Sequence, residues 1–342
     1  MKKAIKNPPE KILIIKPSSL GDVIHSLPFL NAIRNKFLQS EIHWIIAKGF
    51  ESIVEGHPMI NKIWVIDKDR WKKISRLRQT VFELKDIFRS LRNEKYDLAI
   101  DLQGLFRSGV MMKAALAPVR IGFKEAREGS CFFYTHKVMG GRNIHAVDRY
   151  LRIAAELGCD ISDPQFPMPD IQETENVRSI KQLTGRYSVI IPGARKEANK
   201  WPADRYAELG SRLKKNFLVI GGRADEGLCK KIEDQSSGFA RSIAGKTDLL
   251  ELAAIIRSAD YVVSNDTGPM HIAAAFGIPV VAIFGPANPV RTGPYGSGHV
   301  IVQSGLDCAP CYKRRCRDPE CMTAITVDMV YDAVAKRFQE EK

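Results

Sequence analysis

The stretch "KILIIKPSSLGDVIHSLPFL", residues 11–30, decides the fold. A short apolar run, Ile12–Ile15, ends before Pro17, and apolar residues then return every one to four positions from Val23 to Leu30. The first pattern predicts a buried strand, and the second predicts a helix that packs on it. Two serines, a glycine and Asp22 stand where the strand passes into the helix. Ligands of parallel α/β proteins bind at such strand ends, so this turn is the first candidate site.

The same alternation of strand and helix recurs along the chain. Near-continuous apolar strands separated by helices indicate parallel sheets that are covered on both faces. A proline-rich and acidic stretch, residues 160–175, predicts a linker, and we expect domains at 1–165 and 166–342, with the last helix a candidate for packing back on the first domain. Besides residues 11–15, the expected strands are 42–46, 62–66, 98–101, 188–191, 217–220, 261–263, 280–284 and 299–302.

The composition is that of an ordinary globular protein, but the net positive charge is unusually high. The chain has 342 residues, 44% of them hydrophobic, and a formal net charge of +13. This excess predicts an anionic partner: nucleic acid, an anionic membrane surface or a phosphorylated substrate. Nucleic acid is disfavoured because no recognisable binding motif is present. The most apolar stretch, residues 272–284, is too short to span a membrane, and without a signal peptide we expect a cytoplasmic protein.

The positive charge is concentrated between residues 68 and 95, which contain ten Lys or Arg against four acidic residues. Apolar residues recur there at helical spacing, so the stretch predicts an amphipathic basic helix. Two interpretations are open. The helix is either a solvated surface element or a docking face for an anionic, partly lipidic acceptor.

Asp22 has two interpretations from its position alone. As an early helix residue it can cap the helix, and as a carboxylate beyond a strand end it can act as a general base toward a hydroxyl. Ser18 and Ser19 stand beside it. Gly21 is a single glycine without the G-x-G-x-x-G fingerprint, which disfavours a nicotinamide enzyme.

Two later strand ends carry groups suited to phosphate. In "IPGARKEANKWP", residues 191–202, a Pro-Gly turn is followed by Arg195, Lys196 and Lys200. Backbone N–H groups and cations at a strand end suit a diphosphate. In "SNDTGPMHIAAAFGIPVVAIFG", residues 264–285, a buried strand ends at a predicted helix start, where free N–H groups and the helix dipole favour an anion.

A third strand end and a cysteine cluster carry weaker signals. "GGRADEGLCKKI", residues 221–232, places Asp225 or Glu226 where an acid commonly accepts hydrogen bonds from ribose. Seven cysteines in a chain without a secretion signal do not predict a disulfide framework. The spacing C-x2-C-x4-C-x4-C is compatible with a metal loop and also with a reduced, locally packed loop. The four cysteines are Cys308, Cys311, Cys316 and Cys321.

Taken together, "KILIIKPSSLGDVIHSLP" and "SNDTGPMHIAAAFGIPVVAIFGPANP" resemble the bacterial lipopolysaccharide heptosyltransferases, glycosyltransferase family 9. The resemblance covers nearly the whole chain, with several motifs in the same order. It implies an α/β fold of the GT-B class: two Rossmann-like domains whose parallel sheets face a central cleft, the first binding the acceptor and the second binding the ADP-sugar.

The stretches "GFKEAREGSCFFY", residues 122–134, and "HAVDRYL", residues 145–151, resemble most the members that add the first heptose to the Kdo of lipid A. The resemblance thus implies inverting transfer from ADP-heptose to Kdo-lipid A at the anionic inner-leaflet surface of the inner membrane. Members that add the second heptose are an alternative, and a GT-B-shaped sugar-nucleotide epimerase is another. No cofactor is implied, and because no acidic D-x-D motif stands beside the donor site, no metal is expected.

The resemblance also assigns roles to residues. Asp22 is the implied base, Lys200 contacts the ADP phosphates, and Glu226, with Asp225 as the alternative, holds the ribose. Ala194 and Arg195 stand where some members carry hydroxyl residues, and Arg195 is expected to substitute as a charge partner. The implied substrate-binding residues are Ser18, Ser19, Gly21, Lys200, Arg195, Glu226, Asp266, Thr267, Gly268, His271 and Arg127.

Overall fold

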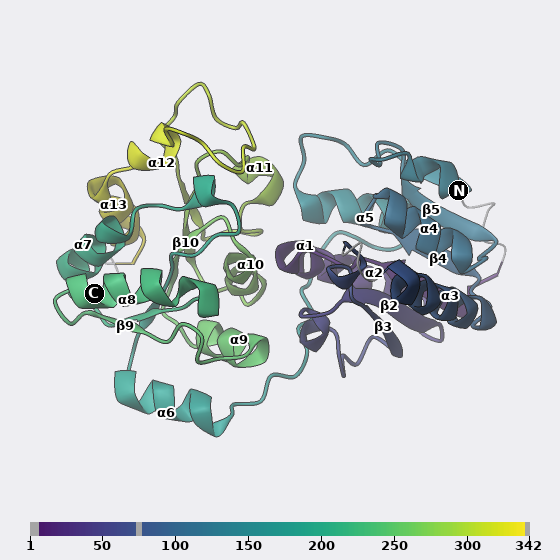
Figure 1. The fold of residues 1–342 in the computed structure, drawn as a ribbon, viewed down its shortest axis with the longest axis horizontal. Helices are drawn as coiled ribbons and strands as arrows, with labels where there is room; N and C mark the ends of the chain where they lie inside the picture. Colours follow the sequence, from purple (N-terminus) through teal and green to yellow (C-terminus); the bar gives the residue numbers. More distant parts are fainter. Residues whose placement is uncertain (1–6, 73–76, 339–342) are drawn as a thin grey trace. The chain divides into compact units, whose positions relative to one another are not determined.

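The computed structural model describes residues 7–72 and 77–338, and the chain forms two compact units that divide between Asp170 and Ile171. Each unit is an α/β structure with one six-stranded sheet (Figure 1). Within the described ranges, no helix is both long enough and apolar enough to cross a membrane.

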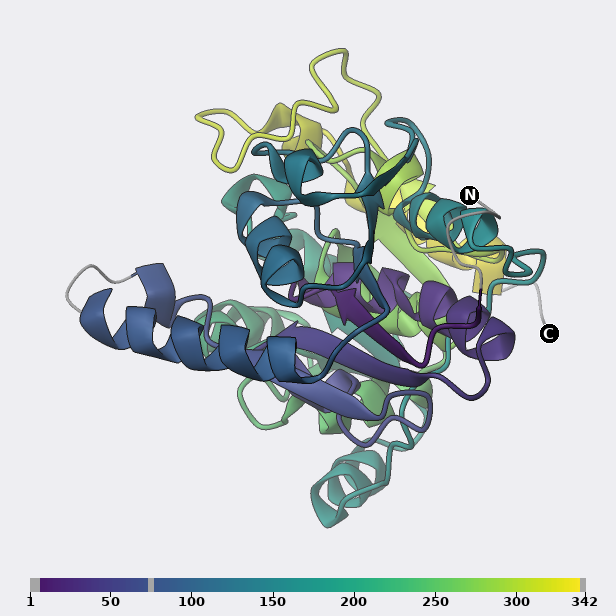
Figure 2. The ribbon, with the colours of Figure 1, turned by 90° about the vertical axis from the view of Figure 1, so that its right-hand side faces the viewer.

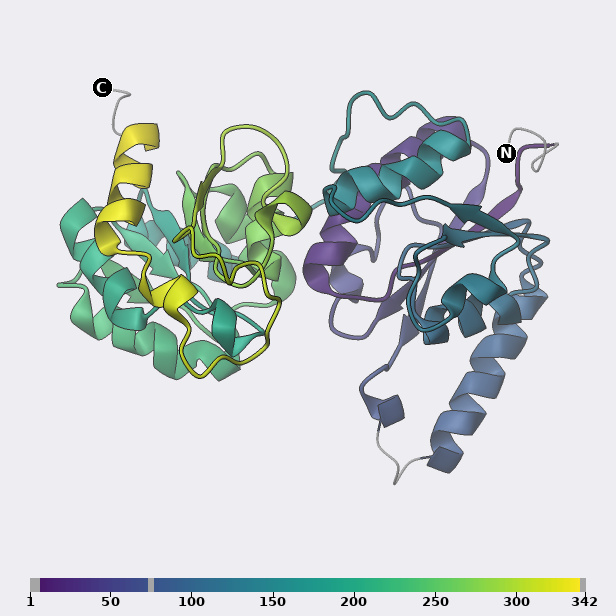
Figure 3. The same ribbon diagram turned by 90° about the horizontal axis from the view of Figure 1, so that it is seen from above.

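The N-terminal unit has an all-parallel sheet in the order β3-β2-β1-β4-β5-β6. Ile12–Ile15 of the central strand are completely buried, because helices cover both faces. Figure 3 shows α2 and α5 on one face of this sheet and α3 and α4 on the other. The strands are β1 (Lys11–Ile15), β2 (Glu41–Ala47), β3 (Lys62–Ile66), β4 (Leu98–Asp101), β5 (Val119–Phe123) and β6 (His136–Val138). The helices are α1 (Leu20–His25), α2 (Leu27–Lys36), α3 (Leu77–Asn93), α4 (Phe106–Ala114) and α5 (Ala146–Glu156), with short 3-10 turns η1 (Glu51–Ile53), η2 (Arg70–Lys72) and η4 (Ser130–Phe133).

The C-terminal unit repeats this plan, with the strand order β12-β11-β10-β7-β8-β9 and parallel pairing throughout. An apolar core lies between this sheet and the helices α7, α8 and α13. The strands are β7 (Ser188–Ile191), β8 (Phe217–Val219), β9 (Ala240–Ser242), β10 (Val262–Asn265), β11 (Val280–Ile283) and β12 (Val300–Val302). The helices are α6 (Glu175–Thr184), α7 (Ala203–Leu213), α8 (Glu226–Gln235), α9 (Leu249–Arg257), α10 (Gly268–Ala275), α11 (Pro289–Thr292), α12 (Glu320–Thr323) and α13 (Val327–Phe338), with 3-10 turns η5 (Glu197–Asn199) and η6 (Arg223–Asp225).

The last helix packs on α7, β11 and β12, and Val330 and Val334 are fully buried in the core of the C-terminal unit. It therefore belongs to the C-terminal unit.

The basic stretch 68–95 forms the 3-10 turn η2 and the helix α3, while its residues 73–76 lie outside the described part of the chain. Leu91 of α3 is buried in the core, and Ile87 and Phe88 pack against that core. Val81 and Phe82 are exposed instead. In Figure 2 the amino-terminal part of α3 extends beyond the sheet of its own unit, which explains why apolar residues there stay uncovered.

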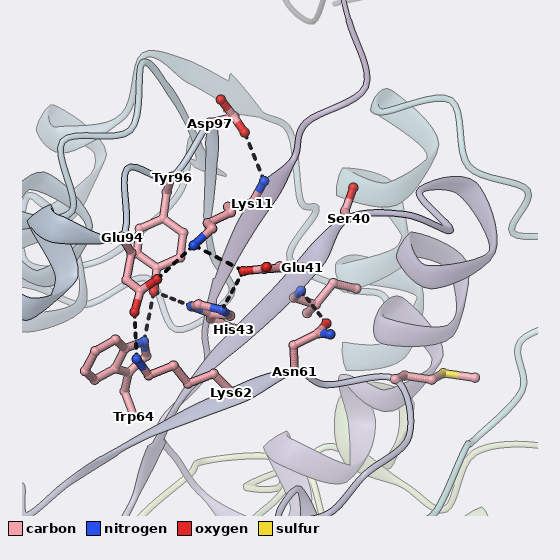
Figure 4. Close-up of polar contacts among 12 residues, drawn as sticks. Lys11, Ser40, Glu41, His43, Asn61, Lys62, Trp64, Glu94, Tyr96 and Asp97 are labelled. Carbon is pink, nitrogen blue, oxygen red and sulfur yellow. Dashed lines mark hydrogen bonds and ion pairs between the residues drawn. The ribbon is translucent and has the colours of Figure 1, made fainter.

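A polar network closes the amino-terminal edge of the first sheet (Figure 4). Glu94 accepts hydrogen bonds from Lys62 (2.6 Å) and Lys11 (3.1 Å). The Tyr96 hydroxyl accepts from Trp64 (2.9 Å) and pairs with Nδ1 of His43 (2.8 Å). Burial lowers the pKa of His43. Because this edge is opposite the carboxyl ends of the strands, the network ties the beginnings of neighbouring strands together and serves stability.

Candidate active site

In the N-terminal unit, Asp22 occupies the first turn of α1 just beyond β1. Its Oδ2 accepts hydrogen bonds from the backbone N–H (2.9 Å) and the hydroxyl (2.8 Å) of Ser19. Its Oδ1 accepts from the Tyr150 hydroxyl (3.3 Å) and lies 3.7 Å from Nζ of Lys16. The side chain of Asp22 is 38% exposed, so this carboxylate is hydrogen-bonded and ion-paired and is still reached by solvent.

Lys16, the cation beside Asp22, is buried, with 3% of its side chain exposed. Nζ donates to the Leu102 carbonyl (3.4 Å) and lies 5.0 Å from the centre of the Tyr150 ring. Burial works to lower the pKa of Lys16, but the charges of Asp22, Tyr150 and Asp101 outweigh it, so the pKa is raised above its ordinary value. Lys16 is therefore an ammonium ion beside the Asp22 carboxylate.

A second buried carboxylate, Asp101 at the end of β4, organises the adjoining loop. It accepts hydrogen bonds from the N–H groups of Gln103 and Gly104 and from two hydroxyls, those of Ser108 (2.8 Å) and Tyr134 (2.7 Å). Burial raises the pKa of Asp101 against the opposing effect of these bonds.

The loop that Asp101 holds reaches two of the predicted site residues. The Gln103 side chain accepts from the backbone N–H of Ser18 (3.3 Å), and the Gly104 carbonyl accepts from the N–H of Arg127 (2.9 Å). The Arg127 side chain is exposed. The structure thus joins Ser18, Ser19, Asp22 and Arg127 to one set of loops at the carboxyl edge of the first sheet, with Gly21 buried among them.

In the C-terminal unit, the carboxyl ends of β7 and β8 surround a cavity of about 540 Å³. Three predicted donor-binding residues, Arg195, Lys200 and Thr267, line it. The other lining residues are Ile191, Gly193, Ala194, Ile220, Gly221, Gly222, Ala224, Asp225, Thr247, Asp248, Leu249, Leu252 and Pro269.

The loops after β7 and β10 are linked by the buried side-chain amide of Asn265, a residue that the sequence did not point to. Asn265, the last residue of β10, accepts from the Trp201 N–H (3.2 Å) and the Tyr206 hydroxyl (3.0 Å) and donates to the Pro192 carbonyl (2.7 Å). Asn199 donates to Asp266 (3.0 Å). These bonds hold the loop after β7 against the loop after β10.

Thr267 is the N-cap of α10, with extended backbone geometry. Asp266 and Gly268 flank it, and His271 is buried within α10. Free N–H groups and the positive end of the helix dipole attract anions at such a terminus. With Arg195 and Lys200 on the same cavity wall, the arrangement suits a diphosphate.

The two acids after β8 lie differently. Asp225 lines the cavity and accepts from the N–H of Gly222 (3.1 Å). The Glu226 carboxylate lies beside Gly245 instead, where an added Cβ would stand 2.3 Å from Oε1. The resemblance implied Glu226 for the ribose, with Asp225 as the alternative, and of these two acids Asp225 lines the cavity.

The cysteine loop carries no formed metal site. Cys308, Cys311 and Cys316 are exposed thiols and Cys321 is buried. Burial raises the pKa of Cys321, and the three neighbouring thiols raise it further. Across the described ranges, no three His, Cys, Asp or Glu side chains are arranged to hold a metal ion, so the structure gives no support to the metal interpretation of this loop.

Comparisons with known proteins point to one protein family. The profile of Glycosyltransferase family 9 (heptosyltransferase) matches residues 84–322. Lipopolysaccharide heptosyltransferase 1 of Escherichia coli K12 is 28% identical over 305 residues, covering 86% of this chain and 93% of the relative. Lipooligosaccharide heptosyltransferase 2 of Campylobacter jejuni is 26% identical over 337 residues, covering 94% and 96%. The solved structure of the E. coli heptosyltransferase WaaC with ADP aligns at a TM-score of 0.77 and 25% identity, covering 97% of this chain and 99% of that one. These comparisons confirm the GT-B class that the resemblance implied.

Proposed function

The chain belongs to glycosyltransferase family 9, the heptosyltransferases, and from that premise we propose that it transfers L-glycero-D-manno-heptose from ADP-heptose to the inner Kdo of Kdo-lipid A. Family membership makes it a glycosyltransferase of lipopolysaccharide core synthesis and sets the epimerase alternative aside. The donor, the acceptor and the roles of the residues are our proposal.

The observation that carries the proposal is the hydrogen-bonded setting of Asp22. Oδ2 accepts two hydrogen bonds from Ser19, and Oδ1 accepts one from Tyr150 and lies beside the Lys16 ammonium. An ionised carboxylate at a strand end is suited to remove a proton from an acceptor hydroxyl, and a positioned base is worth about 10²–10⁴ in rate. We assign Oδ1 as the oxygen that receives the proton.

The leaving group is the ADP diphosphate. As the acceptor oxygen attacks the anomeric carbon from the face opposite ADP, the bond to the diphosphate breaks and negative charge grows on its oxygens. Lys200, Arg195 and the N-terminus of α10 line or adjoin one cavity, and fixed cations and dipoles of this kind stabilise such charge. Asp225 on the same wall is placed to accept from the ribose hydroxyls.

The identity of the acceptor is supported by fewer observations than that of the donor. Relatives named as heptosyltransferase 1 and as heptosyltransferase 2 both match over most of the chain. We favour heptosyltransferase I because the stretch around Arg127 resembles those members, and heptosyltransferase II is the second candidate. The net charge of +13 supports an anionic glycolipid acceptor and action at the inner face of the inner membrane.

The test is ADP release from ADP-heptose by the natural protein and by Asp22→Asn, with Asp163→Asn, an exposed acid of the same unit, as the matched control. We expect release that depends on Kdo-lipid A, retained by the control and reduced about 10²-fold or more in Asp22→Asn while the donor still binds. Release only with a heptosylated Kdo-lipid A would instead identify heptosyltransferase II. Full activity of Asp22→Asn would remove Asp22 as the base.

A further inference from the structure

Two large aromatic side chains stand uncovered at one end of α4. Phe132 is 85% exposed and Phe106 is 54% exposed. A single exposed apolar residue needs no explanation, but neighbouring exposed aromatics mark surfaces that bind something. The segments that carry these two residues, α4 and η4, pack against each other.

Hydrogen bonds and ring packing join the start of α4 to residues 127–133. The N–H of Phe106 donates to Glu128 (3.2 Å), and the N–H of Arg127 donates to Gly104 (2.9 Å). The Phe133 ring lies 5.6 Å from the Phe106 ring at 70°. Phe133 also covers Gly109, where an added Cβ would stand 2.4 Å from the ring. With Phe133 packed inward on α4, the preceding Phe132 of η4 is presented outward.

Two exposed arginines lie on the segments near the two phenylalanines. Arg107 follows Phe106 in α4, Arg127 lies in the segment fastened to Gly104, and both side chains are exposed. We call Phe106, Arg107, Arg127 and Phe132 the aromatic rim. Exposed rings accompanied by guanidinium groups match a lipid surface, where aromatic side chains enter the interface and cations meet phosphate headgroups.

We propose that the aromatic rim docks this protein on the surface of an anionic lipid bilayer. The proposal rests on the proposed function, because a glycolipid acceptor is itself a component of a bilayer. Charge argues for this occupant over a second copy of the chain, since each copy carries +13 and copies of like charge repel. Docking would also bring the acceptor sugar to Arg127, which belongs both to the rim and to the predicted acceptor contacts.

The experiment measures binding of the full chain to vesicles of phosphatidylcholine alone and of phosphatidylcholine with phosphatidylglycerol. The test variant is Phe106→Ser with Phe132→Ser. The matched control is Leu183→Ser, a 67% exposed apolar residue of α6 in the other unit. We expect the double variant to bind the anionic vesicles about tenfold or more weakly than the natural protein. The control should bind within about twofold of it. Both variants should remain folded in thermal unfolding, because none of the replaced side chains is buried.

A kinetic measurement separates docking from catalysis. Transfer to a lipid-free Kdo acceptor should be unchanged in the double variant, whereas transfer to Kdo-lipid A in anionic vesicles should fall with the loss of binding. Unchanged vesicle binding by the double variant overturns the proposal. So does a natural dimer that the double variant converts to a monomer without loss of vesicle binding, because the rim would then be a subunit contact. If the natural protein transfers to neither acceptor, the proposed function fails, while the vesicle result still decides the docking proposal.

Discussion

Lys16 offers the sharpest test of the site, because it is a buried ammonium ion 3.7 Å from the carboxylate to which we assign the chemistry. Replacing it by methionine keeps most of the side-chain volume and removes the charge. Its neighbours Tyr150 and Ser19 remain to hold the Asp22 carboxylate, so the variant isolates the electrostatic contribution.

The expected size follows from the separation. Two unit charges at 3.7 Å attract by about 1 kcal/mol at the dielectric constant of water and by about 4–5 kcal/mol at an effective constant of 20. The Asp22 side chain is 38% exposed, so solvent screening places the value toward the lower end, about 1–2 kcal/mol. Because 1.36 kcal/mol corresponds to one pH unit, loss of the ammonium should make the carboxylate take up a proton about one pH unit higher.

The assay is the pH dependence of kcat/KM for transfer from ADP-heptose. The acid limb of the profile, where activity disappears as the base is protonated, should move upward by about one pH unit in Lys16→Met. Lys113→Met, which removes an exposed cation of the same unit, should leave the limb in place. A folded Lys16→Met protein with an unmoved acid limb would refute the reasoning, and a uniform loss of activity at every pH would reduce Lys16 to a packing role.

Three further outcomes are expected. Asp101→Ala removes the acceptor of four donors, three of them buried, and should lower the unfolding free energy by about 3 kcal/mol or more, against about 1 kcal/mol for Tyr134→Phe, in urea titrations. The hydrogen bond from Lys62 lowers the pKa of Glu94 below its ordinary 4.5. This bond therefore stabilises the folded protein above pH 4.5, and that stabilisation is lost as the pH falls. Glu94→Gln should therefore lower the unfolding free energy by about 1 kcal/mol at pH 7 and by less as the pH falls through the folded-state pKa of Glu94, and a cost that stays equal at low pH would contradict the sign. Gly221→Ala would place a Cβ 2.7 Å from that of Asp225 and should weaken ADP binding about tenfold in calorimetry, with unchanged binding counting against this cavity as the nucleotide site.

The central strands could be predicted from the sequence because burial on both faces leaves a continuous apolar run. All nine expected strands are present, several with the same bounds. The three that the sequence did not reveal, β5, β6 and β9, are peripheral. β6 and β9 are edge strands of three residues each, and β5 carries Arg120 and Gly122 within "VRIGF". Short or half-covered strands lack the apolar run on which such prediction depends.

The sequence placed Arg195, Lys200 and Thr267 in loops that follow strands, and the structure brings these three residues to one cavity. Their roles in binding stay predictions. Tyr150 is 128 residues from Asp22 and reaches it only because α5 packs beside α1. No local pattern reports such packing.

The two interpretations of Asp22 that the sequence left open are compatible, because its two carboxylate oxygens do different things. Oδ2 closes the first turn of α1 through both bonds to Ser19, which is the work of a cap. That bond pair fixes the side-chain rotamer and thereby holds Oδ1 in one place, beside Lys16 and Tyr150. A base must be positioned as well as ionised to be effective. The bonds from Ser19 position the Asp22 side chain, and the Lys16 ammonium favours its ionised form. An aspartate that caps a helix start can therefore also serve as the base.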